Sequence, residues 1–409
     1  MGSIVQIDKI PNNIRSLVKT GLGFALKKGI LGQTPIDFVQ IENSLSGGRT
    51  GAAVFVARYG ISDKNNSDSK EESSGSTFIR VLKITLKDDC LSEKEGYVKT
   101  REILLDIFSE VEYYSQDEFT FQDKEYGILL YQDVGAVATS DLKGVTDFLT
   151  KKILKSNNSE EAEKFSRELS LLLQKEVFLG LKKGLYGRLQ RKELNFLEFY
   201  GKKISLNVQD EIDKLKKIDR NLPNSSTIVD FFNFNSSYHQ VNYIHGDLNP
   251  ENILVWENER GFLNCKLIDF GEVVPKKKEN FTPLFWDFSR LMGELILNFV
   301  EDTLLTSKDE NKEIIVHIQE IDQFLIEFWS ILEAFFQNDS SKLDNASSQI
   351  GFISRIYLST LFDFINEAKS GIKDLRRAEV LQDYFFVKLA FCFFMQSFKE
   401  KILIRESSV

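Results

Sequence analysis

The stretch that decides the fold is Tyr243–Gly271, YIHGDLNPENILVWENERGFLNCKLIDFG. Its two short apolar runs, ILV and KLI, are separated by the turn-rich segment ENERGFLN, and this pattern predicts a β-hairpin. Asp247 and Asn252 precede the first arm, and Asp269 follows the second. We therefore expect two carboxylates and an amide oxygen at one end of the hairpin. These are hard oxygen ligands of the kind that Mg²⁺ takes beside phosphate oxygens.

The motifs HGDLNPEN and LIDFG resemble the catalytic loop and the metal-binding triplet of the protein-kinase-like superfamily. The triplet His-Gly-Asp favours its aminoglycoside phosphotransferase and choline kinase branch. The resemblance implies ATP and Mg²⁺ as cofactors, with Asn252 and Asp269 as metal ligands. It also implies that Asp247 accepts a hydroxyl proton and that His245 supports the loop. The alternative is that Asp247 and Asp269 are ordinary turn carboxylates, since Asp is common beside hairpins.

Composition narrows the class of protein. Hydrophobic residues make up 42% of the 409 and charged residues 28%, which is typical of a soluble globular protein. The net charge of -9 argues against bulk nucleic-acid binding, and three histidines are too few for a His-rich zinc site. The cysteines have no metal or disulfide spacing, and the chain starts without a secretory signal pattern. We expect a cytoplasmic protein without a membrane span.

The first third of the chain predicts an amphipathic helix over 12–33 and then strands at FVQIEN and AAVFVARY. The turn between these strands, SLSGGRTG, has the offsets of a GxGxxG loop, with Ser in place of the first Gly. Such a loop lets backbone N–H groups approach phosphate oxygens, although a Gly-rich hairpin turn is the simpler alternative. The nucleotide-binding candidates here are Ser46, Gly47, Gly48, Arg49 and Gly51.

The next strand, FIRVLKI, places Lys83 as a lone cation in an apolar run. The resemblance implies that Lys83 pairs with nucleotide phosphates and with a helix glutamate, whereas the alternative is a surface lysine on an edge strand. The following helix, SEKEGYVKTREILLDIF, offers Glu95 and Glu102 on one face; we favour Glu95. A strand and hinge at YGILLYQDVGA would then receive an adenine ring on the backbone of Tyr131, Gln132 and Asp133.

The rest of the chain is predominantly helical in pattern. Apolar spacing predicts helices over 142–154, 160–185 and 189–200, and a helical insertion over about 155–230. The insertion resembles those that shape the substrate pocket of small-molecule phosphotransferases, but a dimerisation or structural insert is equally open. Further helices are expected over 313–337, 350–367 and 376–404. Asp287 opens the helix FWDFSRLMGELI; the resemblance implies that it braces the catalytic loop, and a plain N-terminal acid is the alternative.

Together these features predict an α+β, two-lobed protein-kinase-like fold. Its parts would be an N-terminal helical extension (1–35), an N-lobe of antiparallel strands with one helix (36–135) and a helical C-lobe (136–409). The implied reaction is transfer of the γ-phosphoryl group of ATP to a hydroxyl of a small molecule, because no Ala-Pro-Glu follows the LIDFG motif and Asn249 replaces a lysine common in protein kinases. The alternatives are a protein kinase or adenylyltransferase, and a nucleotide-sensing module of a bacterial defence or signalling system.

Overall fold

The computed structural model describes residues 4–8, 10–28, 36, 38–45, 52–60, 77–100, 111–113, 118–131, 143–154, 159–187, 190–193, 210, 213, 224, 226–227, 229–230, 237–257, 260–275, 282–300, 323–324, 326–328, 330–334, 339–345 and 348–369. The chain divides into two compact units. The first comprises residues 1–145 with 251–272, and the second comprises residues 146–250 with 273–409. The helical and strand content is mixed, as the α+β class requires, while the two-lobed arrangement and its boundaries stay a prediction.

The first unit is built on a seven-stranded sheet in the order β1-β2-β3-β4-β7-β5, with β6 also paired to β7. The β1–β2 pair is parallel, and every other neighbouring pair is antiparallel. The strands expected from the apolar runs form the four central members of this sheet. The bounds are β1 Ile4–Gln6, β2 Phe38–Leu45, β3 Ala53–Gly60, β4 Thr77–Leu86, β5 Val111–Tyr113, β6 Phe119–Phe121 and β7 Lys124–Tyr131.

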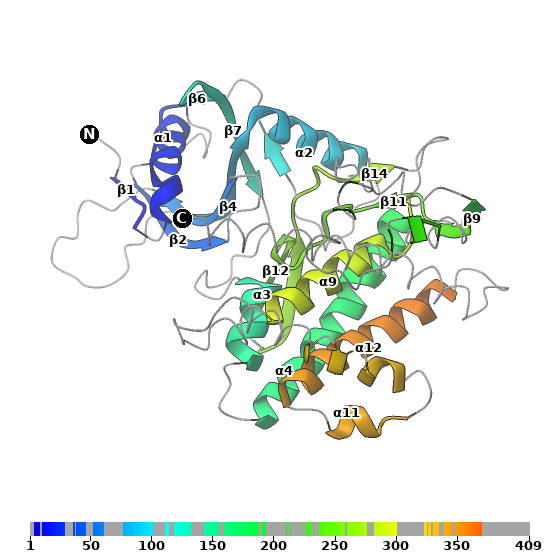
Figure 1. Cartoon of the computed structure of the whole chain (residues 1–409). Helices are drawn as coiled ribbons and strands as arrows, with labels where there is room; N and C mark the ends of the chain where they lie inside the picture. The colour runs from blue at the N-terminus through cyan, green and yellow to red at the C-terminus, as the bar shows by residue number, and fades with distance from the viewer. Residues whose placement is uncertain are drawn as a thin grey trace. The chain divides into compact units, whose positions relative to one another are not determined.

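Helix α1 (Asn12–Lys28) belongs to this unit and packs on the sheet (Figure 1). Its apolar stripe, which includes Leu17 and Leu22, lies in one buried cluster with Leu82 and Ile84 of β4. Because successive side chains of a strand point to opposite faces, the even-numbered residues of β4 face α1. The helix predicted over 12–33 is thus confirmed for 12–28, and it forms part of the core of the first unit.

The odd-numbered residues of β4 point to the other face of the sheet, which helix α2 (Lys87–Thr100) covers. This helix begins directly after β4 ends, with no connecting loop. Thr85 fixes the junction, because its hydroxyl donates to the Asp89 carboxylate (3.1 Å) in the first turn of the helix. Lys83 lies on this covered face.

The predicted hairpin is confirmed as β12 (Ile253–Glu257) and β13 (Leu263–Leu267), which pair antiparallel. The short strand β8 (Lys143–Gly144) adds to the other edge of β12. A single 3₁₀ turn, η5 (Pro250–Asn252), leads into β12. Residues 251–272 cluster with the first unit, so the hairpin and the large sheet belong together.

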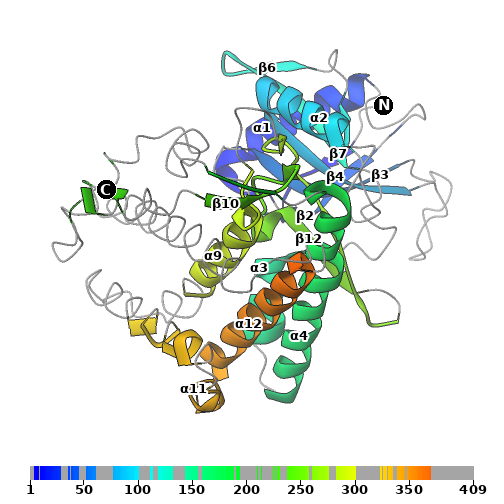
Figure 2. The same cartoon turned by 90° about the vertical axis from the view of Figure 1, so that its right-hand side faces the viewer.

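The second unit is mainly helical (Figures 1 and 2). Its α4 and α12 lie side by side, and α4 buries Ala162, Phe165 and Leu169. The helical bounds are α3 Val145–Phe148, η2 Leu149–Leu154, α4 Ser159–Leu172, η3 Leu173–Phe178, α5 Leu179–Leu181, η4 Lys182–Tyr186, α9 Trp286–Val300, α11 Ser341–Asn345 and α12 Ser348–Lys369. Two short ribbons complete it: β9 Gln190–Glu193 with β10 Ser237–Gln240, and β11 Tyr243–Ile244 with β14 Val274–Pro275.

One expectation about the secondary structure is wrong. Residues 189–200 were predicted to be helical, but Gln190–Glu193 forms β9 and pairs antiparallel with β10. The four cross-strand residue pairs, from Gln190 with Gln240 to Glu193 with Ser237, outweigh the local helical spacing. Residues 194–200 and the helix expected over 376–404 lie outside the described residues. Among the helices that the structure describes, none has the length and apolar character needed to cross a bilayer.

If α1 is part of the core of the first unit, Leu22→Ala will destabilise the protein by about 2–5 kcal/mol, because the Leu22 side chain is fully buried. Urea unfolding measures this loss. The control is Lys19→Ala, an exposed position on the same helix, which we expect to change stability by less than about 0.5 kcal/mol. Equal effects of the two substitutions would show that α1 does not contribute to the core.

Candidate active site

Lys83 lies in the centre of the large sheet and is buried. It sits opposite Val54 of β3 and Leu129 of β7, and the residue is only 6% exposed. Its Nζ donates to Oε2 of Glu93 at 2.9 Å and to Oδ2 of Asp269 at 2.5 Å. The alternative of a surface lysine on an edge strand is therefore excluded.

The glutamate that pairs with Lys83 is Glu93, which corrects the expectation of Glu95. The side chain of Glu93 is almost fully buried, whereas Glu95 is exposed. Residues two apart on a helix point to nearly opposite sides, so α2 cannot present both to the sheet. Because α2 begins immediately after β4, the acid that faces Lys83 comes earlier than we expected. The other candidate, Glu102, lies outside the described residues.

Tyr131 has a side-chain contact that the sequence did not suggest. Its ring is fully buried at the end of β7, and its hydroxyl donates to Oε1 of Glu93. Its predicted role was to offer backbone to an adenine ring, together with Gln132 and Asp133, which lie outside the described residues. The glycine-rich loop candidates also lie outside them: Ser46, Gly47, Gly48, Arg49 and Gly51.

Helix α2 also docks on the segment that follows β13. The Ser92 hydroxyl donates to the Gly271 carbonyl (3.0 Å), and the Tyr97 ring lies 5.9 Å from the Phe270 ring. At Gly96 the helix backbone comes so close that an added Cβ would lie 2.0 Å from the Phe270 carbonyl oxygen. Only glycine permits this approach, which holds the helix against the Asp-Phe-Gly triplet.

Asp269 and Asn252 lie at the same end of the hairpin. The Ile268 N–H donates to the Asn252 carbonyl (3.0 Å), so Asn252 is next to the residue that precedes Asp269. Asp269 has a φ of 65°, a left-handed conformation that is uncommon outside glycine and that is often retained at functional sites. Their side chains offer hard oxygen donors that fit Mg²⁺. Among the described residues, no group of three or more His, Cys, Asp or Glu side chains is placed so that it could hold a metal ion.

In the second unit, the buried carboxylate of Asp287 holds the loop at His245 and Gly246. It accepts hydrogen bonds from the backbone N–H of His245 (2.8 Å) and of Gly246 (2.9 Å). The Tyr186 hydroxyl donates to the same carboxylate at 3.3 Å. The Trp286 indole N–H donates to the Gly246 carbonyl at 2.8 Å, so both backbone groups of this glycine are fixed.

Asp247, which follows this loop, has both carboxylate oxygens occupied. Arg290 of α9 pairs with Oδ1 at 2.9 Å, and the Asn249 amide donates to Oδ2 at 3.2 Å. Sequence analysis missed Arg290, although its place one helical turn after Asp287 would have put it on the same face of α9. Asp247, with His245 and Asp287, belongs to the second unit.

Burial and opposite charge set the ionisation of the first-unit cluster. Burial and the Asp269 carboxylate raise the pKa of Glu93 to about 7, against the lowering influence of Lys83 and Tyr131. Burial alone would lower the pKa of Lys83, but the charges of Glu93 and Asp269 outweigh it and raise that pKa above its ordinary value. Lys83 is therefore a permanent cation at physiological pH.

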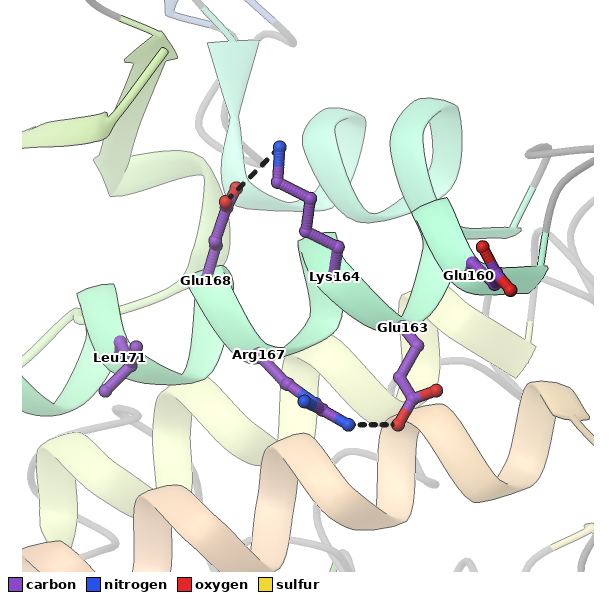
Figure 3. Close-up of a pocket in the computed structure, with 6 residues that line it drawn as sticks. All are labelled: Glu160, Glu163, Lys164, Arg167, Glu168 and Leu171. Carbon is purple, nitrogen blue, oxygen red and sulfur yellow. Dashed lines mark hydrogen bonds and ion pairs between the residues drawn. The ribbon is translucent and has the colours of Figure 1, made fainter. Parts of the chain in front are cut away.

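A shallow hollow of about 260 Å³ lies along one face of α4 (Figure 3). Its charges are matched along the helix: Arg167 pairs with Glu163 (2.6 Å) and Lys164 with Glu168 (3.7 Å). Because all six lining residues come from α4 and none is a predicted site residue, this hollow is a surface groove of that helix.

Comparison with known proteins gives only a coarse likeness. No family model and no curated sequence matches the chain. Among solved structures it is similar to a glucosamine kinase in complex with glucosamine, ADP and inorganic phosphate, with 9% identity over 80% of each chain and a TM-score of 0.33. Crystal form B of glucosamine kinase gives a TM-score of 0.31 at 9% identity, over 86% of this chain and 93% of that chain. Crystal form A gives a TM-score of 0.30 at 8% identity, over 86% of this chain and 91% of that chain. Scores of this size do not establish a shared fold.

Gly96→Ala will displace α2 from the Asp-Phe-Gly triplet, because the new methyl group would meet a backbone carbonyl that cannot move aside. We expect a loss of about 1–3 kcal/mol of stability in urea unfolding. The matched control is Gly23→Ala on α1, where an added Cβ meets nothing within 4 Å and should stabilise by up to about 1 kcal/mol. Stabilisation by both substitutions would show that α2 does not rest on Phe270.

The raised pKa of Glu93 makes stability depend on pH. The folded protein binds the Glu93 proton up to about pH 7, whereas an ordinary glutamate, as in the unfolded chain, has a pKa of 4.5. The stability that this proton contributes is full below the unfolded pKa and is lost as pH rises through about 7. Thermal unfolding from pH 5.5 to 8.5 should show this decline in the wild type and a flatter profile in Glu93→Gln. Parallel profiles would contradict the assignment.

Proposed function

We propose that the protein is an ATP- and Mg²⁺-dependent phosphotransferase that moves the γ-phosphoryl group to a hydroxyl of a small molecule. The observation that carries the proposal is the buried Lys83, held between Glu93 and Asp269. A lysine in the middle of a sheet that is fixed by a helix acid and by the Asp of an Asp-Phe-Gly triplet is the arrangement that phosphate positioning in the kinase-like superfamily requires.

In this proposal Lys83 orients the nucleotide phosphates, and Asp269 and Asn252 would hold Mg²⁺. The ion supplies charge neutralisation of the phosphate oxygens. Lys83 can serve because it is permanently charged and because both of its partners fix its position. Its ammonium has three donors, so two carboxylates leave one donor for phosphate.

Asp247 is the proposed base for the acceptor hydroxyl. Arg290 and Asn249 fix the orientation of its carboxylate. Its side chain is 28% exposed, so it remains accessible to an acceptor. Asp287 accepts hydrogen bonds from the backbone of the two residues that precede Asp247, so Asp247 follows a rigidly held segment.

A small-molecule acceptor is favoured by two sequence features. The chain between Asp269 and Asp287 is short and has no Ala-Pro-Glu triplet, so it lacks the long segment on which protein-substrate kinases seat a polypeptide. Asn249 replaces the lysine found two residues after the catalytic Asp in most protein kinases, and here it donates to Asp247.

The test is ADP release from Mg²⁺ and ATP in the presence of a panel of hydroxyl-bearing metabolites. With a productive acceptor, Asp247→Asn should lower kcat by about 100-fold or more while ATP still binds, because the base is lost and the nucleotide contacts are not. Lys83→Met and Asp269→Asn should weaken ATP binding itself. Asp88→Asn, an exposed acid on α2, is the control and should leave activity unchanged.

Labelled nucleotide separates the alternatives. Transfer from γ-labelled ATP to a metabolite supports the proposal, and transfer to protein would indicate a protein kinase. Transfer from α-labelled ATP would indicate adenylylation. ATP binding with no turnover across the panel, and no change on Asp247→Asn, would favour the nucleotide-sensing module.

A further inference from the structure

We propose that Tyr131 is a positioning residue for Lys83, acting through Glu93. This inference rests on the proposed function, since it assigns the tyrosine hydroxyl a part in phosphate recognition. Three segments meet at this point: β4 supplies the lysine, α2 supplies the glutamate and the end of β7 supplies the tyrosine.

The sheet register places Tyr131 beside Lys83. Lys83 lies opposite Leu129, and Tyr131 is two residues further along β7, opposite Val81. Residues two apart on a strand share a face, so both Tyr131 and Lys83 point to the side that α2 covers. The side chain of Glu93 enters between them from the helix.

The two oxygens of the Glu93 carboxylate have separate partners. Oε2 accepts from the Lys83 ammonium at 2.9 Å, and Oε1 accepts from the Tyr131 hydroxyl. A carboxylate that is held at both oxygens from two neighbouring strands cannot rotate about its terminal bond without losing a hydrogen bond. The Tyr131 hydroxyl therefore fixes the oxygen that Lys83 uses.

Burial increases the importance of the hydrogen bond from Tyr131 to Glu93. Tyr131 is fully buried, and the Glu93 and Lys83 side chains are 1% and 7% exposed, so water cannot replace the hydroxyl. Removal of the hydroxyl leaves a buried carboxylate oxygen without its donor. Among the described residues, the titratable groups that interact with Glu93 include Lys83, Asp269, Tyr131 and Cys90.

The functional consequence follows from competition for the ammonium. Lys83 is shared between Glu93 and Asp269, and its contact with Asp269 is the shorter one, at 2.5 Å. When Glu93 loses its support, the lysine moves toward Asp269. The ammonium then interacts more strongly with Asp269, the proposed metal ligand, and less strongly with phosphate. The loss should therefore appear in binding of the phosphates and not in binding of the nucleoside.

The experiment measures the dissociation constants of ATP with Mg²⁺ and of adenosine for the 409-residue chain. Tyr131→Phe keeps the ring and removes only the hydroxyl; we expect about tenfold weaker ATP binding with adenosine binding unchanged. The matched control is Tyr126→Phe, on the same strand but on the opposite face, where its ring stacks on Phe119. This control should bind both ligands as the wild type does.

A double-substitution cycle tests the route through Glu93. In a Glu93→Gln background, Tyr131→Phe should cause little further loss of ATP affinity, because the charged acceptor is already gone. Equal weakening of ATP and adenosine, or a full tenfold loss in the Glu93→Gln background, would overturn the proposal. If Tyr131→Phe does not fold, Tyr131→Met, whose flexible side chain fills an apolar space, takes its place with the same expectations.

The outcomes separate this inference from the proposed function. A wild type that binds ATP, with Lys83→Met weakened and Tyr131→Phe unchanged, would overturn the role of Tyr131 alone. A wild type that does not bind ATP would overturn both.

Discussion

The first unit depends on one interaction, the buried ammonium of Lys83 between two carboxylates. To remove an isolated charge from water costs several kcal/mol, so this lysine is tolerated at 6% exposure only because Glu93 and Asp269 surround it. The three groups come from β4, α2 and the segment after β13. The fold must therefore bring a helix and a hairpin that are far apart in sequence to the same face of the sheet.

Backbone geometry makes this convergence possible. Helix α2 starts without a loop after β4, and Gly96 lets it approach the Phe270 carbonyl more closely than a side chain would allow. Asp269 adopts a φ of 65°, so its carboxylate turns back toward the lysine. The second unit uses a related device, since the buried Asp287 carboxylate accepts two backbone N–H groups and so fixes the chain before Asp247.

Sequence patterns predicted the features that depend only on the local order of residues. The hairpin, the central strands, α1 and α9 follow from apolar periodicity and turn residues, and Lys83 stands out because a cation interrupts an apolar run. The partner of Lys83 was missed because it depends on where α2 begins, and a one-residue change in the start of a helix rotates every side chain by about 100°. The side-chain contact of Tyr131 with Glu93 and the contact of Arg290 with Asp247 were missed because they depend on strand register and helix packing. The pairing of β9 with β10 joins distant segments, which no local window reveals.

The charge balance at Lys83 bears on how the proposed reaction can begin. One ammonium faces two carboxylates, so with Glu93 ionised the cluster carries a net charge of minus one, and Asn252 adds no charge. An anionic triphosphate would be repelled by such a cluster. A divalent cation held by Asp269 and Asn252 would reverse the local sign of charge, and Lys83 would then have less of the Asp269 carboxylate and more of its charge available to phosphate. Nucleotide affinity should therefore depend on the divalent cation, and the cation and the nucleotide should each strengthen the binding of the other.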